Sequence, residues 1–336
     1  ALMMLPIAQS VVGLLASDAN DRRMKNFSLT VMLSIAYGSS IGGIATLVGT
    51  PPNAATAGIL QSTFNEQVTF FDWMKIALPF SLVLFLVSFF LLVRVIYPNR
   101  LGRFPLGHDI VKESIRQLGP WSRREVWVMI VFVTTALLWI FQQPINGLLA
   151  SFSGAGGEVF SDVTVAMLAV LALFLLPSGQ SKQPLLVWKD TERLPWGVLL
   201  MFGGGMALAE GFDKSGLVQQ ITDGMQSYAH LPPATFLILL SACGLVITAL
   251  MSNITMVTIF IPVVGALAVS CGQSPVLFAI PVTIAASCDF MFPMSTPPNA
   301  IAYGTGAVTS KQMFSAGVLL NLVSFVLLSL LVVILT

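Results

Sequence analysis

Long stretches of the chain contain no Asp, Glu, Lys or Arg, and short polar segments separate them. A helix that crosses a bilayer needs about 20 predominantly apolar residues, so these stretches predict membrane-spanning helices. They cover residues 26–65, 76–93, 126–157, 163–181, 194–209, 224–288 and 312–336. Residues 26–65 and 224–288 are too long for one helix each, so we expect a break in both.

The break in the first of these two stretches lies at the sequence GTPPNAATAG, which begins at Gly49. Consecutive prolines interrupt a helix because they remove backbone donors and clash with the preceding turn. The pattern predicts one helix up to about Val48 and a half-helix near residues 54–61. A second copy, STPPNAIAYG, begins at Ser295 and predicts a second break of the same kind.

The stretch at 224–288 has the polar sequence MSNIT at its centre, between two apolar arms bounded by Gly and Pro. Asn253, between Ser252 and Thr255, indicates two helices that meet at a polar tip, as in a re-entrant hairpin. Pro262 lies in the second arm. The alternative is one spanning helix with a polar kink.

Composition places the chain in the membrane. Hydrophobic residues make up 56% of the 336 residues and charged residues 9%, whereas soluble domains carry about 25% charged residues. The net charge of +1 gives no indication of a nucleic acid or another bulk polyanion as partner. Cys243, Cys271 and Cys288 lack metal-ligand spacing and are interpreted as small buried thiols. We therefore expect an all-α, multi-pass membrane protein.

Basic residues give the orientation. When spans alternate around one re-entrant hairpin, 14 of the 16 Lys and Arg residues fall on one face, and only Lys75 and Lys214 fall on the other. The positive-inside rule makes the basic face cytoplasmic. Residues 108–118 mix apolar and charged side chains and predict an interfacial helix.

The two Pro-Pro-Asn segments belong to a longer internal repeat of hairpin arm, loop, span, TPPNA and half-helix, a common sign of transporters. Aligning Pro6 with Pro262 places the counterparts of residues 252–255 just before residue 1. The chain also begins without an initiator Met. We therefore expect a longer protein in which a second Ser-Asn tip precedes residue 1.

Breaks of this kind indicate ion sites. A broken helix leaves N–H groups unpaired at one half-helix end, which attracts anions, and carbonyls unpaired at the other, which attracts cations. Each repeat adds a Thr and an Asn to its proline pair: Thr50 and Asn53, Thr296 and Asn299. No Lys or Arg occurs in these segments. An anionic solute therefore needs a co-bound cation such as Na⁺, although the pattern does not identify the ion.

Asp289 is the one acidic residue between Asp223 and the C-terminus. Acidic residues at membrane depth are costly and usually functional. One hypothesis is that Asp289 binds a cation or a proton and takes part in coupling. The other is that its carboxylate is hydrogen-bonded in a loop wall or lies at the aqueous end of a helix.

The sequences SNIT, GGIATLVGTPPNA, SCDFMFPMSTPPNA and LPWGVLLMFGGGMALAEGF together resemble those of the divalent anion/sodium symporter family, in family order from residue 1 to the C-terminus. The resemblance implies an inverted-repeat elevator-type transporter of a bacterial inner membrane, working as a homodimer. It implies a transport domain built from residues 1–98 and 233–336, and an interfacial helix and scaffold helices in 99–232.

The resemblance also implies roles for individual residues. The substrate-binding residues are Ser252, Asn253, Thr255, Thr296, Pro297, Thr50 and Pro51. The sodium-binding residues are Gly49, Thr248, Met251, Asn253 and Ser295. Position 254 is Ile where the family motif often has Thr, which removes one hydroxyl next to the expected substrate.

The function implied is secondary active transport of a C4-dicarboxylate coupled to Na⁺, with no organic cofactor and no enzymatic activity. A sodium-independent exchanger of dicarboxylate, tricarboxylate or sulfate is the nearest alternative. An enzyme is disfavoured because the buried segments offer one Asp and no His. A channel fits duplicated tips at one site less well than alternating access does.

Overall fold

The structure is a computed structural model of the chain. It describes residues 22–98, 119–153, 161–178, 183–193, 232–249 and 251–336, and the further residues 4, 8, 9, 12, 116, 203, 204, 207, 211, 214–216 and 220. In this part of the chain every regular element is helical, apart from one isolated bridge between Pro177 and Pro184. The predicted interfacial helix at 108–118 and the stretch at 194–209 lie largely outside the described residues.

The chain divides into two compact units. The first consists of residues 1–68, 72–103 and 198–336, and the second of 69–71 and 104–197. The described helices of the second unit are α6 (Arg123–Ile140), α7 (Gln142–Ser153), α8 (Asp162–Leu175) and the short η2 (Trp188–Arg193). The first unit holds α2 (Arg22–Ile44), α3 (Pro51–Phe64), α4 (Phe70–Phe90, from Asp72 onward), the π-helical η1 (Leu91–Ile96), α11 (Pro233–Thr248), α12 (Asn253–Ser270), α13 (Pro275–Ser287), α14 (Pro297–Gly304) and α15 (Ser310–Leu335).

Four of the described helical segments are long and apolar enough to cross a membrane. They are Arg23–Ile44, Phe70–Ile96, Asn253–Ser270 and Ser310–Leu335. The pair α6 and α7 passes the same test together, with a bend of 73° between its helices. The helices α8, α11 and α13 are apolar but shorter. The prediction of an all-helical protein with several membrane segments is confirmed for the described residues.

Both predicted breaks at Pro-Pro-Asn are present. The first separates α2 from α3, and the second separates α13 from α14. In each case the prolines form the first turn of the following helix, where a missing N–H costs nothing. For this reason the half-helix predicted at 54–61 in fact begins at Pro51 and continues to Phe64. The predicted helix end near Val48 was wrong, because residues 45–50 form turns instead.

The centre of 224–288 is also broken. Helix α11 ends at Thr248 and α12 begins at Asn253, with Ser252 as its N-cap residue. The structure therefore has two helices here, both packed against α13, and not one spanning helix with a kink. Pro262 lies inside α12, which continues through it.

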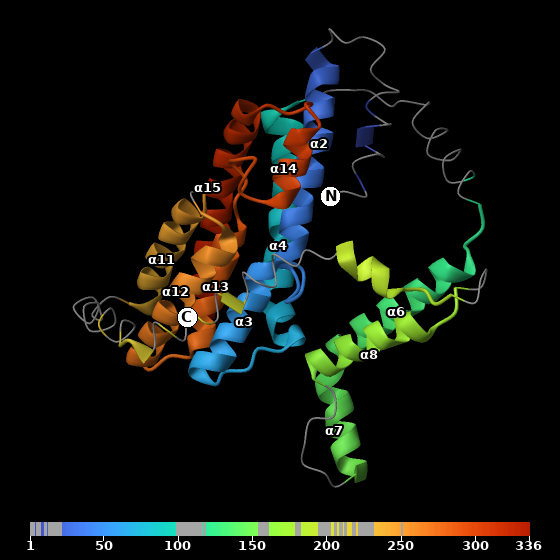
Figure 1. Cartoon of the computed structure of the whole chain (residues 1–336). Coiled ribbons are helices and arrows are strands. Elements are labelled where there is room, and N and C mark those ends of the chain that lie inside the picture. Colours follow the sequence, from blue (N-terminus) through green and yellow to red (C-terminus); the bar gives the residue numbers. More distant parts are fainter. Residues whose placement is uncertain are drawn as a thin grey trace. The chain divides into compact units, whose positions relative to one another are not determined.

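The two halves of the sequence interleave in the first unit. Figure 1 shows the blue α3 beside the orange α12 and α13, and the red-orange α14 beside the blue α2. Helix α13 is the centre of this packing, because nearly every residue from Phe278 to Ser287 is buried. Each broken helix therefore packs against elements of the opposite half.

One buried polar contact joins α3 to α13. The hydroxyl of Thr283 donates to the carbonyl oxygen of Ala279 at 2.8 Å, and the hydroxyl of Thr56 lies 2.6 Å from that of Thr283. Since Thr283 uses its proton within α13, Thr56 is the donor between the helices. Both side chains are fully buried.

This pair gives a double-mutant prediction. Thr283→Val leaves the Thr56 hydroxyl buried without an acceptor, which we expect to cost about 1–3 kcal/mol of unfolding free energy. The double variant Thr56→Val with Thr283→Val removes both hydroxyls, so it should cost less than the sum of the two single changes. Thermal unfolding of the detergent-purified variants measures this. Additive losses would contradict the assigned contact.

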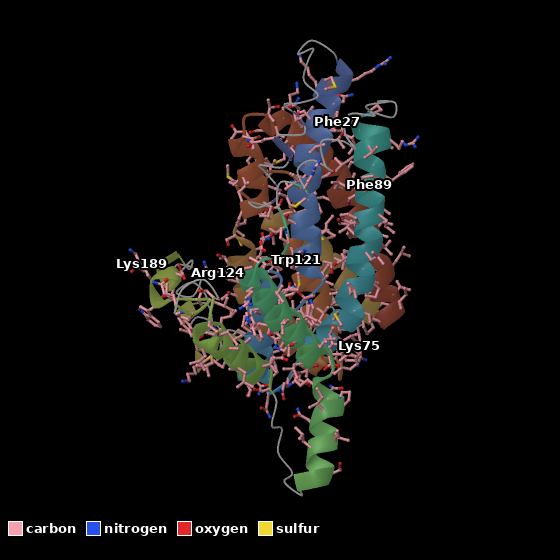
Figure 2. All side chains as sticks on the ribbon, turned by 90° about the vertical axis from the view of Figure 1, so that its right-hand side faces the viewer. Phe27, Lys75, Phe89, Trp121, Arg124 and Lys189 are labelled. Atoms are coloured by element: carbon pink, nitrogen blue, oxygen red, sulfur yellow. The ribbon has the colours of Figure 1, made fainter. Side chains whose placement is uncertain are left out.

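Basic residues of the first unit lie at opposite ends of its long helices. The Nδ2 group of Asn26 donates to the Pro98 carbonyl at 3.0 Å, and the Tyr97 hydroxyl donates to the Gln312 carbonyl at 2.9 Å. The start of α2, the end of η1 and the start of α15 therefore meet. Figure 2 shows Phe89 toward this end of α4 and Lys75 at the other. The basic residues near the starts of α2 and α15 and the end of η1 thus lie at the end opposite Lys75, as predicted for these residues.

Candidate functional site

A cavity of about 350 Å³ lies where the helix breaks of the first unit meet. Its walls come from the end of α2, the first Pro-Pro loop, the start of α12, the end of α13 and the second Pro-Pro loop. The lining residues are Ser39, Ser40, Gly43, Gly49, Thr50, Pro51, Pro52, Ser252, Asn253, Ile254, Ser287, Ser295, Thr296, Pro297 and Pro298. Sequences far apart in the chain (GTPP, SNI and STPP) thus share one cavity.

Three helices begin at this cavity, namely α3, α12 and α14. A helix N-terminus carries a partial positive charge, so each such end attracts an anion. Unpaired N–H groups are offered by the start of α12, because α3 and α14 each begin with two prolines. Two of the N-cap hydroxyls are also free for a solute, because Thr50 and Ser252 make no side-chain capping bond. The third, Thr296, accepts from the Asn299 backbone N–H at 3.4 Å.

None of the lining residues is charged. An anion in this cavity would therefore meet hydroxyls, an amide and helix ends, but no Lys or Arg side chain. Helix-end interactions are each worth about 0.3–1 kcal/mol at exposed sites and up to about 2 kcal/mol when partly buried. Three of them do not neutralise a doubly negative solute, so bound cations would be needed beside it.

Asn53 holds the first loop in place. Its side chain is fully buried, and its Nδ2 group lies 3.2 Å from the Gly43 carbonyl oxygen, 3.3 Å from that of Ile44 and 2.9 Å from that of Thr46. These carbonyls lie at the end of α2, where the helix leaves them without intrahelical partners. Asn53 thereby closes the break between α2 and α3.

Asn299 does the same in the second loop. Its Nδ2 group donates to the carbonyl oxygens of Asp289 at 3.3 Å and Phe292 at 3.1 Å. The acceptors lie ten and seven residues before the asparagine, the spacing that also separates Asn53 from Gly43 and Thr46. The two halves of the first unit therefore share one local construction.

Several buried oxygen atoms at the site lack a hydrogen-bond partner among the described residues. Ser40, Ser287 and Ser295 line the cavity, and each has an unpaired hydroxyl. The Oδ1 atoms of Asn53 and Asn299 are unpaired as well. Buried polar atoms are costly unless a partner satisfies them. The unpaired set consists of oxygens, so it suits a polar or ionic ligand.

Most of the residues predicted for the site line the cavity. These are Gly49, Thr50, Pro51, Ser252, Asn253, Ser295, Thr296 and Pro297. Thr248 lies behind Asn253: it is fully buried, and its hydroxyl is 2.8 Å from Asn253 Oδ1 and 2.7 Å from the Ala286 carbonyl oxygen. Met251 and Thr255 are exposed and do not line the cavity. Asp289 is buried next to the second loop.

Seven lining residues were not among the predicted site residues, namely Ser39, Ser40, Gly43, Ser287, Pro52, Ile254 and Pro298. A signal for the first three was present, since the sequence GSSIGG gathers small residues in the last turns of α2. Small side chains let a backbone and a solute approach closely. Ser287 carried no such signal, because a single serine at a helix end is common.

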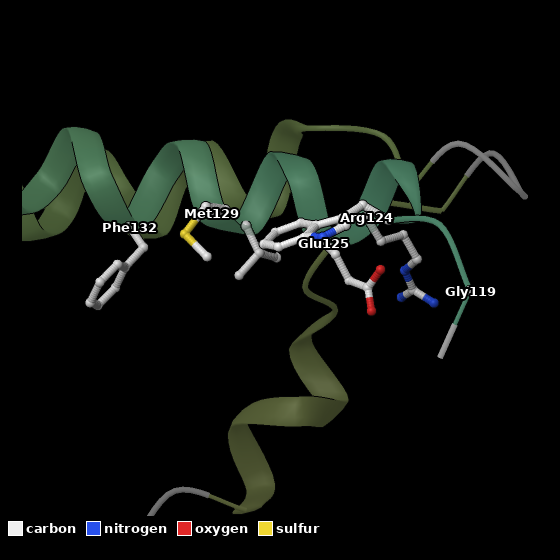
Figure 3. A pocket seen from close by; sticks show the side chains of 7 residues that line it. Gly119, Arg124, Glu125, Met129 and Phe132 are labelled. Carbon is white, nitrogen blue, oxygen red and sulfur yellow. The ribbon is translucent and has the colours of Figure 1, made fainter. Parts of the chain in front are cut away.

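A larger, apolar hollow of about 570 Å³ lies on α6 in the second unit. Figure 3 shows Met129 and Phe132 along the helix, with Arg124 and Glu125 near its start. Glu125 accepts from the Ser122 backbone N–H and hydroxyl in a capping box, so its carboxylate serves the helix end. A surface of this kind suits lipid or another helix, and it offers little to a small anion.

The described residues hold no group of three or more His, Cys, Asp or Glu side chains that could bind a metal ion. The three cysteines are free. Cys288 is buried as predicted, whereas Cys243 and Cys271 are exposed, so the prediction of buried thiols was wrong for these two.

The sequence pattern of the family described as "Sodium:sulfate symporter transmembrane region" matches residues 1–335. The chain belongs to this family. The symporter family consists of multi-pass membrane transporters and not enzymes, so the expectation drawn from GTPPNA, SNIT and STPPNA is confirmed at this level.

Two relatives of this chain carry the name "Sodium-dependent dicarboxylate transporter SdcS". The protein of Staphylococcus saprophyticus is 32% identical over 337 residues, and that of Staphylococcus aureus is 32% identical over 340 residues. Each match covers 98% of this chain and 64% of the relative. The chain thus spans less than two thirds of the length of these relatives.

Proposed function

We propose that the protein transports a small dicarboxylate across the membrane together with Na⁺. The observation that carries this proposal is the meeting of three helix N-termini, those of α3, α12 and α14, at one cavity without a charged side chain. Such a cavity attracts an anion and needs cations to hold it, which gives a physical reason for coupling. The family and the name of its relatives support the same assignment.

Within this cavity we assign the substrate to Ser252, Asn253, Thr50, Pro51, Thr296 and Pro297. The free hydroxyls of Thr50 and Ser252 and the first N–H groups of α12 would donate to the carboxylates of the substrate. The first two residues of α3 and α14 are prolines without an N–H, so these two helices would contribute the partial positive charge of their N-termini. Thr255 is exposed and lies outside the cavity, so we give it no contact with the substrate, although the family pattern predicted one; Met251, which is also exposed, stays a prediction from the family pattern.

We assign Na⁺ to the edges of the same cavity. Gly49 belongs to one site, and Ser295 with Thr248, Met251 and Asn253 to the other. The support is chemical, because Na⁺ prefers oxygen ligands and the Ser295 hydroxyl is unpaired. Thr248 and Asn253 lie within hydrogen-bond distance of each other at 2.8 Å, so a bound ion would compete with that contact.

We further propose an elevator mechanism for a homodimer built on inverted repeats. In this proposal α11 and α12 form a re-entrant hairpin, and residues 1–98 and 233–336 move as the transport domain against scaffold helices in 99–232. The equal spacing of the contacts made by Asn53 and Asn299 supports two repeats. The interleaving of α3 with α12 and α13 supports their movement as one body.

Uptake into proteoliposomes by the complete protein tests the function. With an inward Na⁺ gradient we expect accumulation of labelled succinate, which stops when K⁺ replaces Na⁺. Exchange of preloaded succinate without Na⁺ would instead establish a sodium-independent exchanger. Sulfate is the second substrate to test, because the family description names it. Uptake of neither anion would contradict the proposal.

Two hydroxyl variants test the site. Ser252→Ala removes an N-cap hydroxyl at the cavity, and we expect succinate uptake to fall at least about tenfold, because hydrogen bonds to charged groups are worth about 1.5–3 kcal/mol. Thr255→Val changes a hydroxyl three residues away that lies outside the cavity. We expect uptake by Thr255→Val to stay near that of the native protein. Equal losses in the two variants would contradict the placement of the substrate.

A further inference from the structure

Asp289 is a buried acid that the proposed transport site does not use. It lies in the loop between α13 and α14 and has no exposed surface. Neither carboxylate oxygen has a hydrogen-bond partner. The Ser295 hydroxyl and the Met291 backbone N–H are its neighbouring donors, and neither meets hydrogen-bond geometry. A carboxylate in this state is costly unless a cation or a proton joins it.

The described residues from 232 onward offer no buried basic side chain to neutralise it. Lys311 is the only Lys or Arg between residues 232 and 336, and it is exposed. From the first half, Tyr37 of α2 approaches this loop, and its hydroxyl donates to the Phe290 carbonyl at 3.1 Å. A phenol hydroxyl used in this way supplies no charge.

The loop around Asp289 is held from several sides. The Phe290 N–H donates to Asn321 Oδ1 of α15 at 3.3 Å, and Asn299 Nδ2 donates to the Asp289 carbonyl oxygen at 3.3 Å. At Gly317 of α15, an added Cβ would collide with the Phe290 carbonyl oxygen and the Met291 backbone. These contacts fix the backbone on both sides of the carboxylate, so Asp289 has little freedom to turn toward water.

Further unpaired oxygens surround the same loop. The Ser295 hydroxyl and Asn299 Oδ1 are buried and without partners, as are both carboxylate oxygens of Asp289. Hard cations take oxygen ligands of these types: carboxylate, amide and hydroxyl. Ser287 and Ser295 also line the transport cavity, so Asp289 lies directly behind its wall.

We propose that Asp289 is the anionic ligand of an additional monovalent-cation site, occupied by Na⁺, with Asn299 supplying a further oxygen and Ser295 shared with the neighbouring Na⁺ site proposed above. This inference rests on the proposed function. The site adds one fixed negative charge beside a cavity meant for an anion. Without its cation, Asp289 repels the dicarboxylate, and with it the repulsion is cancelled. Binding of this Na⁺ therefore favours binding of the substrate.

The test is equilibrium binding of labelled succinate to the complete purified protein over a range of Na⁺ concentrations. Asp289→Asn keeps the shape of the side chain and removes its charge. We expect log Kd to depend less steeply on log Na⁺ concentration in this variant, by about one ion. At the lowest Na⁺ concentration the variant should bind succinate at least about fivefold more tightly than the native protein, which is the low end of usual coupling between sites. A purely structural role would not tighten binding.

Asp72→Asn is the matched control. Asp72 is partly exposed in the first turn of α4 and pairs with Lys75 at 3.2 Å, so this variant loses the same charge at a surface position. We expect its Na⁺ dependence to match that of the native protein. Should Asp289→Asn not fold, Asp289→Ser provides a smaller polar variant with the same expectation.

The outcomes separate the two proposals. If the native protein binds no succinate in the presence of Na⁺, the proposed function fails. If the native protein binds succinate with Na⁺ but Asp289→Asn and Asp289→Ser keep the native steepness, the additional cation site is overturned. The second result would also follow if Asp289 held a proton in place of Na⁺.

Discussion

Gly49→Ala should nearly abolish transport, while Gly42→Ala should leave it close to native. A Cβ at position 49 would collide with the Gly43 carbonyl oxygen and lie 2.8 Å from Thr46 Oγ1. The first group is backbone and the second lies in a tight turn, so both have little room to move. At Gly42 an added Cβ has no neighbour within 4 Å. The two substitutions therefore have the same chemistry in opposite surroundings.

The expected size of the Gly49 effect follows from crowding at the site. Overpacking costs about 1–3 kcal/mol, which lowers the equilibrium constant for the native loop about five- to 150-fold. Because Gly43 and Gly49 both line the cavity, this shift also displaces its wall. Sodium-driven succinate uptake by both variants, normalised to the amount of folded protein, measures the difference. Native uptake by Gly49→Ala would show that the loop is not packed against the end of α2.

Removing the side chain of either loop asparagine should harm transport almost as much as Gly49→Ala does. Asn53→Ala deprives buried carbonyls at the end of α2 of their donor, and Asn299→Ala does the same in the second loop. A buried group left without a partner costs about 1–3 kcal/mol. Asn53 contacts three carbonyl oxygens and Asn299 two, so we expect the larger loss of unfolding free energy in Asn53→Ala.

Gln61→Ala is the control for these variants, because Gln61 is an exposed amide on the same helix as Asn53. We expect Gln61→Ala to unfold and transport like the native protein. The asparagine variants should show both a lower unfolding temperature and at least about tenfold slower uptake, since 1.4 kcal/mol corresponds to a factor of ten. An asparagine variant with native values in both measurements would show that this asparagine does not hold its loop in place.

Much of the site was predictable because prolines and asparagines act locally. Two adjacent prolines cannot lie inside a helix, so the breaks at Pro51 and Pro297 follow from the sequence alone. The polar sequence at 252–255 within an apolar stretch indicated the third break. Repetition of the same motif then predicted that the breaks meet, and the cavity lined by both Pro-Pro loops agrees with that prediction.

The remaining features depend on packing that a local pattern does not carry. Thr255 differs little from Ser252 as a sequence signal, but Ser252 precedes the helix and faces the cavity, whereas Thr255 lies in the first turn of α12 and is exposed. Ser39 and Ser40 enter the site because α2 ends against the first loop. The pairing of Thr56 with Thr283 depends on the interleaving of α3 and α13, which local sequence does not specify.

The three helix starts also explain why the cavity needs no basic residue. In the proposed account, helix ends and removable cations hold the anion while Na⁺ is bound and allow its release when Na⁺ leaves. In the proposed account Asp289 strengthens this dependence, because it makes the vacant site less favourable to an anion. The protein would thus couple substrate binding to Na⁺ from two directions, by attraction and by relief of repulsion.

The central claim is that both halves of the chain contribute to one binding cavity. The direct test introduces a single cysteine at Ser39 in the first half or at Ile254 in the second, both lining residues without an assigned ligand role. The background replaces the exposed Cys243 and Cys271 by serine, and Ser310→Cys, at an exposed position outside the cavity, is the control.

The measurement is the rate of maleimide labelling in the complete protein with and without succinate and Na⁺. At a succinate concentration about ten times its Kd, we predict that labelling at positions 39 and 254 slows in parallel by about tenfold, while labelling at position 310 is unchanged. Protection of one of the two cavity positions without the other would contradict a single site shared by both halves.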